Sequence, residues 1–130
     1  MKRRSVPFEI PNVNHGFVVV KGLFHIKEGK IVLEFDERDG FVGFMKSDVK
    51  EIEVPFSEID SISGTKKWFS YRIEIVASSM KTFQDIPGAE QGKLTLKVQR
   101  KDRTAAEEVI SNGRLRLSEY KLKQLEQEQE

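Results

Sequence analysis

Two lysines followed directly by two aromatic residues, in the stretch KKWF, are the strongest candidate for a binding site in this chain. Aromatic rings bury large areas, so Trp68 and Phe69 are suited to anchoring the chain in a partner's pocket or at a membrane interface. Lys66 and Lys67 would then meet acidic groups on that surface. The alternative is that Trp68 covers one end of the fold while the lysines belong to a solvated loop.

A second group of large apolar residues lies in the glycine-spaced segment DGFVGFM. If Phe41, Phe44 and Met45 are exposed, they form an apolar patch suited to self-association. The alternative is that these residues belong to the hydrophobic core. The sequence alone leaves both interpretations open.

Few residues are suited to catalysis. Cysteine is absent, and His15 and His25 are the only histidines. No serine or threonine lies in a nucleophile elbow, and no glycine-rich phosphate loop precedes a helix. Carboxylates are frequent between residues 36 and 60, but exposed strand faces explain them more simply than a metal site or an acid–base pair. We therefore expect a protein that is not an enzyme, with no catalytic residues, no metal and no cofactor.

The composition narrows the class of protein further. The chain has 130 residues, 22 of them basic and 21 acidic, which gives a net charge of +1. A nucleic-acid-binding domain usually has a clear basic excess, so we expect no nucleic-acid partner. The longest apolar run is residues 17–20, far shorter than the roughly 20 residues of a membrane span. A cytoplasmic protein with one domain is the expectation.

Strand patterns occupy most of the chain. The segment 16–36 predicts a hairpin with the two-residue turn Glu28-Gly29, where glycine can take the positive φ of a tight turn. Further strands are predicted at 49–54, 68–78 and 94–98, while the segments 41–45 and 80–83 fit either a loop or a short strand. Pro55 ends the strand 49–54, and the apolar spacing then changes from two to three. That change predicts a bend.

The first residues depart from this pattern. Pro7 and Pro11 interrupt residues 1–14, which predicts an arm that lies outside the sheet or along its edge, and not a central strand.

The pattern changes again near the end of the chain. From Asp102 the composition favours a helix, with Thr104 and Glu107 at the spacing of a capping box. The triplet Ser111-Asn112-Gly113 predicts the end of that helix. Residues 113–130 then form a charged tail with helix-forming composition.

The order of about seven strands and one helix resembles the pleckstrin-homology (PH) superfold, especially the bacterial PH-like and GRAM-like domains. Three segments carry the resemblance: the hairpin GLFHIKEGKIVLEF, the corner EIEVPFSEIDSI, and the last strand with its helix, KLTLKVQRKDRTAAEEVI. The resemblance implies a mainly β fold. Its form would be a PH-like barrel of about seven antiparallel strands over residues 15–112, capped by a C-terminal α-helix.

PH-like domains bind phosphoinositides, peptides or other copies of themselves. Their lipid-binding members use a basic loop between the first two strands, but the turn Glu28-Gly29 is too short to wrap an inositol headgroup. The resemblance therefore implies a non-catalytic interaction domain that binds a protein or peptide partner, or self-associates as a homo-oligomer. We expect the partner in a groove between the C-terminal helix and the sheet, near Trp68 and Val109.

Two other functions stay open. The first is peripheral binding to an anionic membrane through Lys66, Lys67 and Trp68, helped by the basic residues 2–4. The second is a small-molecule carrier or minor enzyme that uses the barrel interior. Tight packing of the inward residues would remove this second alternative; they are Leu33, Phe35, Ile73, Ile75, Leu96 and Val98.

Overall fold

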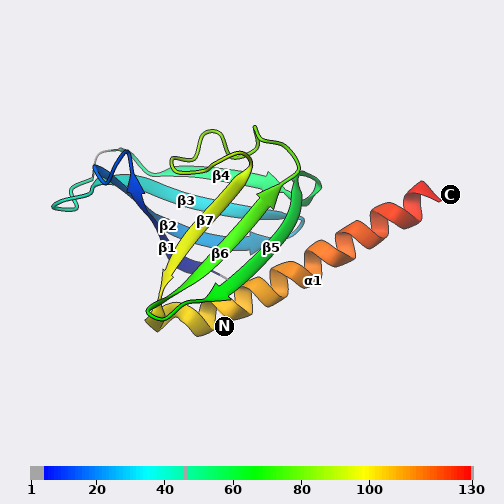
Figure 1. Cartoon of the computed structure of the whole chain (residues 1–130). Helices are drawn as coiled ribbons and strands as arrows, with labels where there is room; N and C mark the ends of the chain where they lie inside the picture. The colour runs from blue at the N-terminus through cyan, green and yellow to red at the C-terminus, as the bar shows by residue number, and fades with distance from the viewer. Residues whose placement is uncertain (1–4, 46, 130) are drawn as a thin grey trace.

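The computed structural model describes residues 5–45 and 47–129, which form one antiparallel sheet and a long helix packed against it (Figure 1). The strands are β1 (Ser5–Val13), β2 (Val18–Lys27), β3 (Lys30–Asp39), β4 (Lys50–Pro55), β5 (Ile59–Lys66), β6 (Ser70–Ala77) and β7 (Lys93–Gln99). The helix α1 (Arg103–Glu128) follows β7. The fold class predicted from the sequence, mainly β with seven antiparallel strands and a C-terminal helix, is confirmed.

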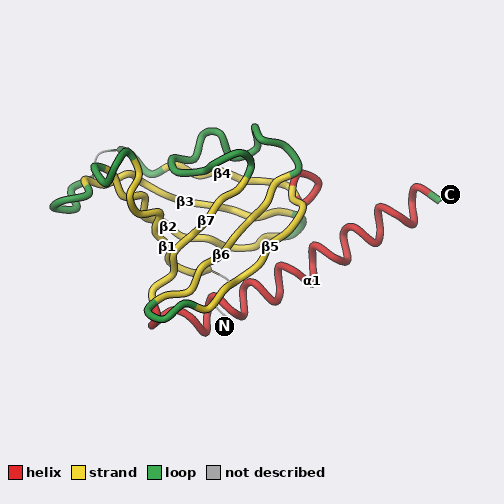
Figure 2. The backbone as a smooth tube through the Cα atoms, in the orientation of Figure 1, coloured by secondary structure: helices red, strands yellow, loops and turns green. Residues whose placement is uncertain are grey.

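The sheet curls without closing into a barrel (Figure 2). Its strand order is β4-β3-β2-β1-β7-β6-β5, so β4 and β5 are the two edges. Each strand except β1 and β7 pairs only with strands that are adjacent in sequence. The pair of β1 with β7 therefore joins two halves of the sheet, and it consists of the single match Glu9–Lys97.

The strand β1 corrects the expectation of an arm. Residues Ser5–Val13 lie inside the sheet, and their even-numbered members Val6, Phe8 and Ile10 are buried in the core. Prolines four residues apart lack the N–H donor on the same side of a strand. The ladder to β2 is regular only from Ser5 to Ile10, with Pro11 in the irregular part that follows, and the ladder to β7 is a single match, so the two missing donors cost few ladder hydrogen bonds. Burial of three apolar side chains then outweighs that cost.

The hairpin turn at Glu28-Gly29 and the bend after Pro55 agree with the predictions from the sequence. Lys27 pairs with Lys30 across the turn, and Gly29 has a φ of 74°. The strand β4 ends at Pro55, one turn of 3-10 helix follows, and β5 begins at Ile59. The amide of Phe56 donates to the Gly29 carbonyl at 3.0 Å, which ties the corner to the hairpin turn.

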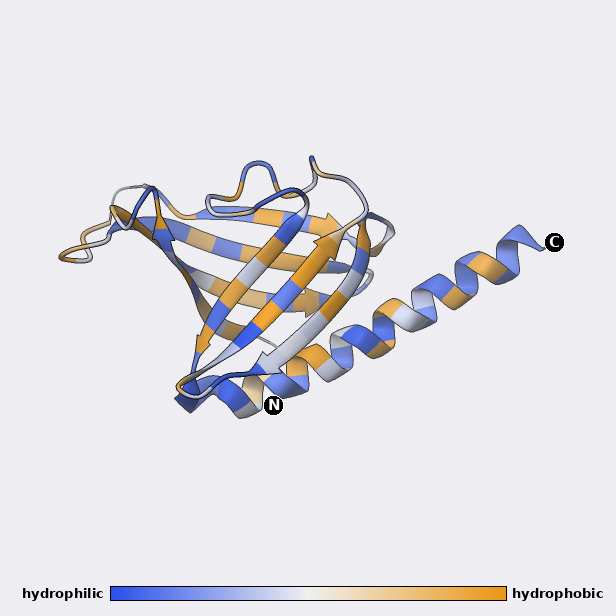
Figure 3. Ribbon diagram, in the orientation of Figure 1, coloured by the Kyte–Doolittle hydropathy of each residue, from blue (hydrophilic) through white to orange (hydrophobic). Residues whose placement is uncertain are grey.

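Apolar and polar residues alternate along strands such as β6 and β7, as the orange and blue bands of Figure 3 show, and the apolar members of these strands are the buried ones. The inward residues named from the sequence, Leu33, Phe35, Ile73, Ile75, Leu96 and Val98, are all at most 1% exposed. A water-sized space next to them would raise that fraction. The interior around these side chains is therefore packed core, which leaves no room there for a small ligand.

The helix α1 differs from its prediction at both ends. It runs without interruption through Ser111-Asn112-Gly113, so the predicted stop is wrong. Gly113 is buried against Ile26, and a Cβ atom there would lie 3.1 Å from the Ile26 Cδ1 atom, so this glycine serves close packing. The capping box is also wrong, because the helix begins at Arg103 and the N-cap Asp102 makes no side-chain hydrogen bond.

Two segments that fitted either a loop or a short strand are resolved by the structure. The segment 80–83 forms turns, and its Phe83 fills the core. The segment 41–45 is a loop that returns to β3 through one bridge between Met45 and Arg38.

Candidate interaction surfaces

The turn between β5 and β6 exposes the aromatic residues that the sequence singled out. Trp68 is 83% exposed and Phe69 is 75% exposed, with their ring centroids 6.3 Å apart in an edge-on arrangement. The turn is held by the Lys67 amide, which donates to the Ser70 carbonyl at 2.9 Å. Trp68 therefore does not cover an end of the fold, and Phe69, which precedes β6, also lies outside the core.

The structure brings three further basic residues to this turn. Ser70, the first residue of β6, pairs with Gln99, the last residue of β7. The chain then continues into Arg100, Lys101 and Arg103, and one Arg103 guanidinium nitrogen donates to the Lys67 carbonyl at 3.5 Å. We call this surface the basic–aromatic tip; it consists of Lys66, Lys67, Trp68, Phe69, Arg100, Lys101 and Arg103.

The charge of the basic–aromatic tip exceeds that of the whole chain. Five basic residues gather there with Asp102 as their acidic neighbour in sequence, whereas the full chain carries a net charge of +1. Sequence reasoning found Lys66 and Lys67 but missed the three later residues. The strand pattern at 94–98 was visible, but its pairing register with β6 was not.

The second candidate surface lies at the turn between β1 and β2 and the loop after β3. We call it the apolar tip; its exposed members are Phe17, Phe41, Val42, Phe44 and Met45. Of the two interpretations left open for Phe41, Phe44 and Met45, the structure shows the exposed one, with these side chains outside the core. Sequence reasoning missed Phe17 and Val42, which join the patch only when the two loops meet.

Hydrogen bonds order the apolar tip. The Gly40 amide donates to the Phe17 carbonyl at 2.9 Å, and the Phe17 and Phe41 rings pack edge-on at 5.5 Å. The Val42 amide donates to the Asp39 carboxylate at 2.9 Å, and the Asp39 amide donates to the Phe44 carbonyl at 2.7 Å. The apolar tip is therefore an ordered loop whose apolar side chains are exposed to solvent.

Val109 cannot line the predicted groove between the helix and the sheet. Val109 is 4% exposed, because α1 presses it together with Ala106 and Ile110 against the sheet. Val109 is a core residue and has no surface to offer a partner. The helix and the basic–aromatic tip do meet, but at the start of α1 through Arg103.

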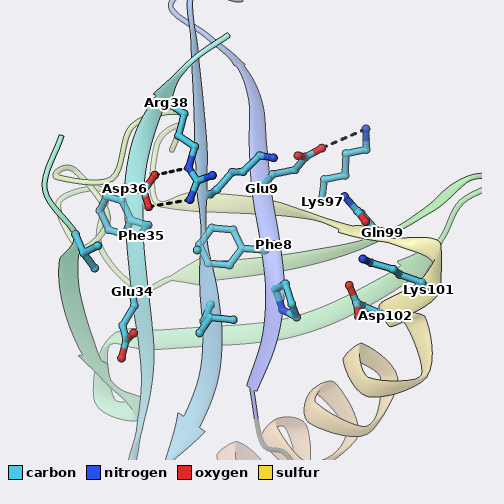
Figure 4. A pocket seen from close by; sticks show the side chains of 15 residues that line it. Phe8, Glu9, Glu34, Phe35, Asp36, Arg38, Lys97, Gln99, Lys101 and Asp102 are labelled. Atoms are coloured by element: carbon cyan, nitrogen blue, oxygen red, sulfur yellow. Dashed lines mark hydrogen bonds and ion pairs between the residues drawn. The ribbon is translucent and has the colours of Figure 1, made fainter. Parts of the chain in front are cut away.

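A shallow crevice of about 600 Å³ lies over β1, β2, β3 and the end of β7 (Figure 4). Charged groups of both signs line it, and they contact each other. The Asp36 carboxylate accepts from Arg38 at 2.8 Å, which raises the pKa of that guanidinium, and the Glu9 and Lys97 side chains lie 3.6 Å apart. Because four of its charged groups are paired with each other and its lining mixes both signs, the crevice is a weaker candidate for an anionic or cationic ligand than the basic–aromatic tip.

The remaining possibilities for chemistry are limited. Across residues 5–45 and 47–129, no three His, Asp or Glu side chains gather in a way that suits a metal ion. In the same part of the chain, no helix has both the length and the apolar character required to cross a bilayer. The basic residues 2–4, expected to help in membrane binding, lie outside the described residues.

Comparisons of the chain with protein-family models, with curated proteins and with solved structures gave no match. The PH-like resemblance therefore stays a prediction from the sequence motifs.

Proposed function

We propose that this protein is a non-catalytic interaction domain of PH-like type that binds anionic membrane surfaces through its basic–aromatic tip. One observation carries the proposal: the two most exposed aromatic rings, Trp68 and Phe69, adjoin five basic residues drawn from two distant segments. Each Lys or Arg near an anionic bilayer contributes about 1 kcal/mol, and tryptophan favours the membrane–water interface.

The shape of the tip also favours a membrane. The two exposed rings lie on the turn at the end of the β5–β6 hairpin, which Figure 1 shows beside the start of α1. A lipid interface deforms around a projecting ring, whereas a protein partner must supply a matching pocket. Full burial of such a side chain stabilises the bound state by about 1.5–3 kcal/mol.

The other predicted mode was a protein or peptide partner, or self-association. Its expected location, the groove at Val109, is filled by core packing. A partner with an acidic pocket for Trp68 is therefore the alternative that the experiment must distinguish.

The proposal is tested by cosedimentation with vesicles of phosphatidylcholine alone and of phosphatidylcholine with phosphatidylserine. Trp68 is the only tryptophan, so a blue shift of its emission reports entry of this ring into the interface. We expect binding only to the anionic vesicles, and weaker binding at high salt. Trp68→Ala should lower the affinity about tenfold or more, since that factor corresponds to about 1.4 kcal/mol.

Charge reversal supplies the matched comparison. Lys66→Glu with Lys67→Glu should abolish most of the binding, whereas Lys27→Glu, at the turn where related domains carry their lipid loop, should leave it unchanged. Equal binding to neutral vesicles, or no loss with the Lys66 and Lys67 reversals, would reject the membrane proposal. An absence of any vesicle binding would leave the acidic protein partner as the better explanation of the tip.

A further inference from the structure

The outer face of α1 carries exposed leucines that the sheet does not cover. The helix turns its buried residues toward the sheet; they are Ala106, Val109, Ile110, Gly113 and Leu117. At about 100° per residue, Leu115 and Leu122 point to the opposite side. These two and Leu125 are 56–58% exposed. In the seven-residue repeat of coiled coils, with positions a to g, this spacing places Leu115 and Leu122 at a and Leu125 at d.

The last part of α1 also leaves the domain (Figure 1, Figure 2). Tyr120 is the last half-buried residue, with its ring 6.1 Å from that of Phe56. Lys121 donates to the Asp60 carbonyl at 2.6 Å, and all residues 121–129 are exposed. A helix end of this length gains little stability by itself in water, because helices in proteins depend on packing of an apolar face.

The charges beside the leucines select a second copy of this chain as the partner. In heptad terms, Arg114 and Lys121 occupy g positions on one side of the seam, and Glu119 and Glu126 occupy e positions on the other. In a parallel pair, each g side chain faces the e side chain five residues later on the other helix. Arg114 would then face Glu119 of the second copy, and this pair carries the charge match, because the Lys121 ammonium already donates to the Asp60 carbonyl of its own chain.

An antiparallel pair does not fit these charges. In that arrangement e positions face e positions, so the flank with Glu119 would meet the same acidic flank of the second copy. Like charges in such contact repel. The charge pattern therefore matches the parallel arrangement and not the reverse.

We propose that the outer face of α1 binds a second copy of this chain as a parallel two-fold dimer, with Leu115, Leu122 and Leu125 at its centre. The sheets lie on the far sides of the two helices and do not obstruct the pairing. Fewer than two heptads are apolar, whereas sustained coiled coils have about three or four. Dimerisation should therefore be weak, with a dissociation constant on the order of 0.1 mM.

Parallel pairing has a geometric result for the basic–aromatic tip. Because that tip adjoins the start of α1, both tips of a parallel dimer lie at the same end. Two sites on one assembly raise the effective affinity for an extended surface. The dimer itself does not depend on membrane binding, and each proposal has its own test.

The first test is sedimentation equilibrium of the full chain from about 10 μM to about 1 mM, a range that brackets the expected dissociation constant. We expect a monomer–dimer equilibrium that Leu122→Asp shifts fully to monomer. Arg114→Glu should weaken the dimer, and Arg114→Glu combined with Glu119→Arg should restore it. Lys123→Glu, exposed on the same helix but outside the seam, is the matched control and should change nothing.

The second test reads the direction of pairing. The chain has no cysteine, so a single introduced thiol is unambiguous. Ser118 is a d position, and d faces d only in a parallel pair. Ser118→Cys should form a disulfide-linked dimer on mild oxidation, while Gln124→Cys, outside the seam, should not. A monomer at every concentration, a dimer that survives Leu122→Asp, or equal crosslinking of both variants would overturn the proposal.

Discussion

Replacing Gly22 with alanine should destabilise the domain more than any change at a turn glycine. A Cβ atom on Gly22 would collide with the Glu34 carbonyl oxygen of β3 and lie 2.8 Å from the Phe35 Cα atom. Both obstacles are backbone atoms, so no side chain can rotate away to make room. The β2–β3 ladder must open at the point where Gly22 pairs with Phe35.

The magnitude follows from the two costs that such an opening combines. Overpacking costs about 1–3 kcal/mol, and each lost ladder hydrogen bond costs about 0.5–1.5 kcal/mol. The expected loss is therefore about 3 kcal/mol or more, a large share of the roughly 5–15 kcal/mol that holds a domain folded. Gly29→Ala is the control, because a Cβ atom there would meet open space. The alanine would lose only about 1–2 kcal/mol from the positive φ of this position.

Urea denaturation followed by circular dichroism measures both variants. Fluorescence is a poor probe of unfolding here, since Trp68 is already in solvent in the folded protein. With a slope of about 2 kcal/mol per molar urea, Gly22→Ala should lower the midpoint by about 1.5 M or more. If Gly22→Ala costs no more than Gly29→Ala, then the close approach of β2 to β3 is not what the structure describes, and the reasoning fails.

Two further predictions concern buried residues. Burial raises the pKa of Tyr71, with a smaller contribution in the same direction from Glu107, so the folded state favours the protonated phenol. This contribution to stability is fully present below about pH 10, the pKa of the phenol in the unfolded chain, and is lost as the pH rises from there toward the pKa of the folded state. Tyr71→Phe should therefore reduce the loss of stability at alkaline pH, measured by denaturation curves recorded from neutral to alkaline pH. Val109→Ala should lower the free energy of unfolding by about 2 kcal/mol, because it leaves a cavity under α1. At temperatures where the variant is folded, its vesicle binding should be unchanged. A loss of binding with no loss of stability would instead make Val109 a contact residue.

The elements that sequence reasoning located correctly are those specified by local chemistry. Gly29 supplies the positive φ of its turn, and Pro55 ends β4 because it cannot donate to the ladder. Alternation of apolar residues then specifies which face of each strand is buried. The exposure of Trp68 and Phe41 was one of two stated alternatives, because a lone turn pattern does not say what packs over it.

The errors arose where tertiary contacts override local preference. Pro7 and Pro11 argue against a central strand, but β1 has one sparse neighbour that tolerates them. Glycine often ends helices, but the absence of a side chain at Gly113 instead lets α1 approach Ile26 closely. Arg103 reaches the basic–aromatic tip only through the β6–β7 register, which no local motif encodes.

The single match between β1 and β7 also has a consequence for how the domain comes together. Strands β1 to β4 form one run of neighbouring hairpins, and β5 to β7 with α1 form another, connected through the corner at residues 56–58. Each run can form from contacts that are close in sequence, while the Glu9–Lys97 match requires the two finished halves to meet. Contacts between distant segments form slowly because loop closure costs entropy first. The domain thus consists of two halves joined at the corner. If the backbone were cut there, each fragment would keep its own hairpins and an apolar face complementary to the other, through which the two could reassemble.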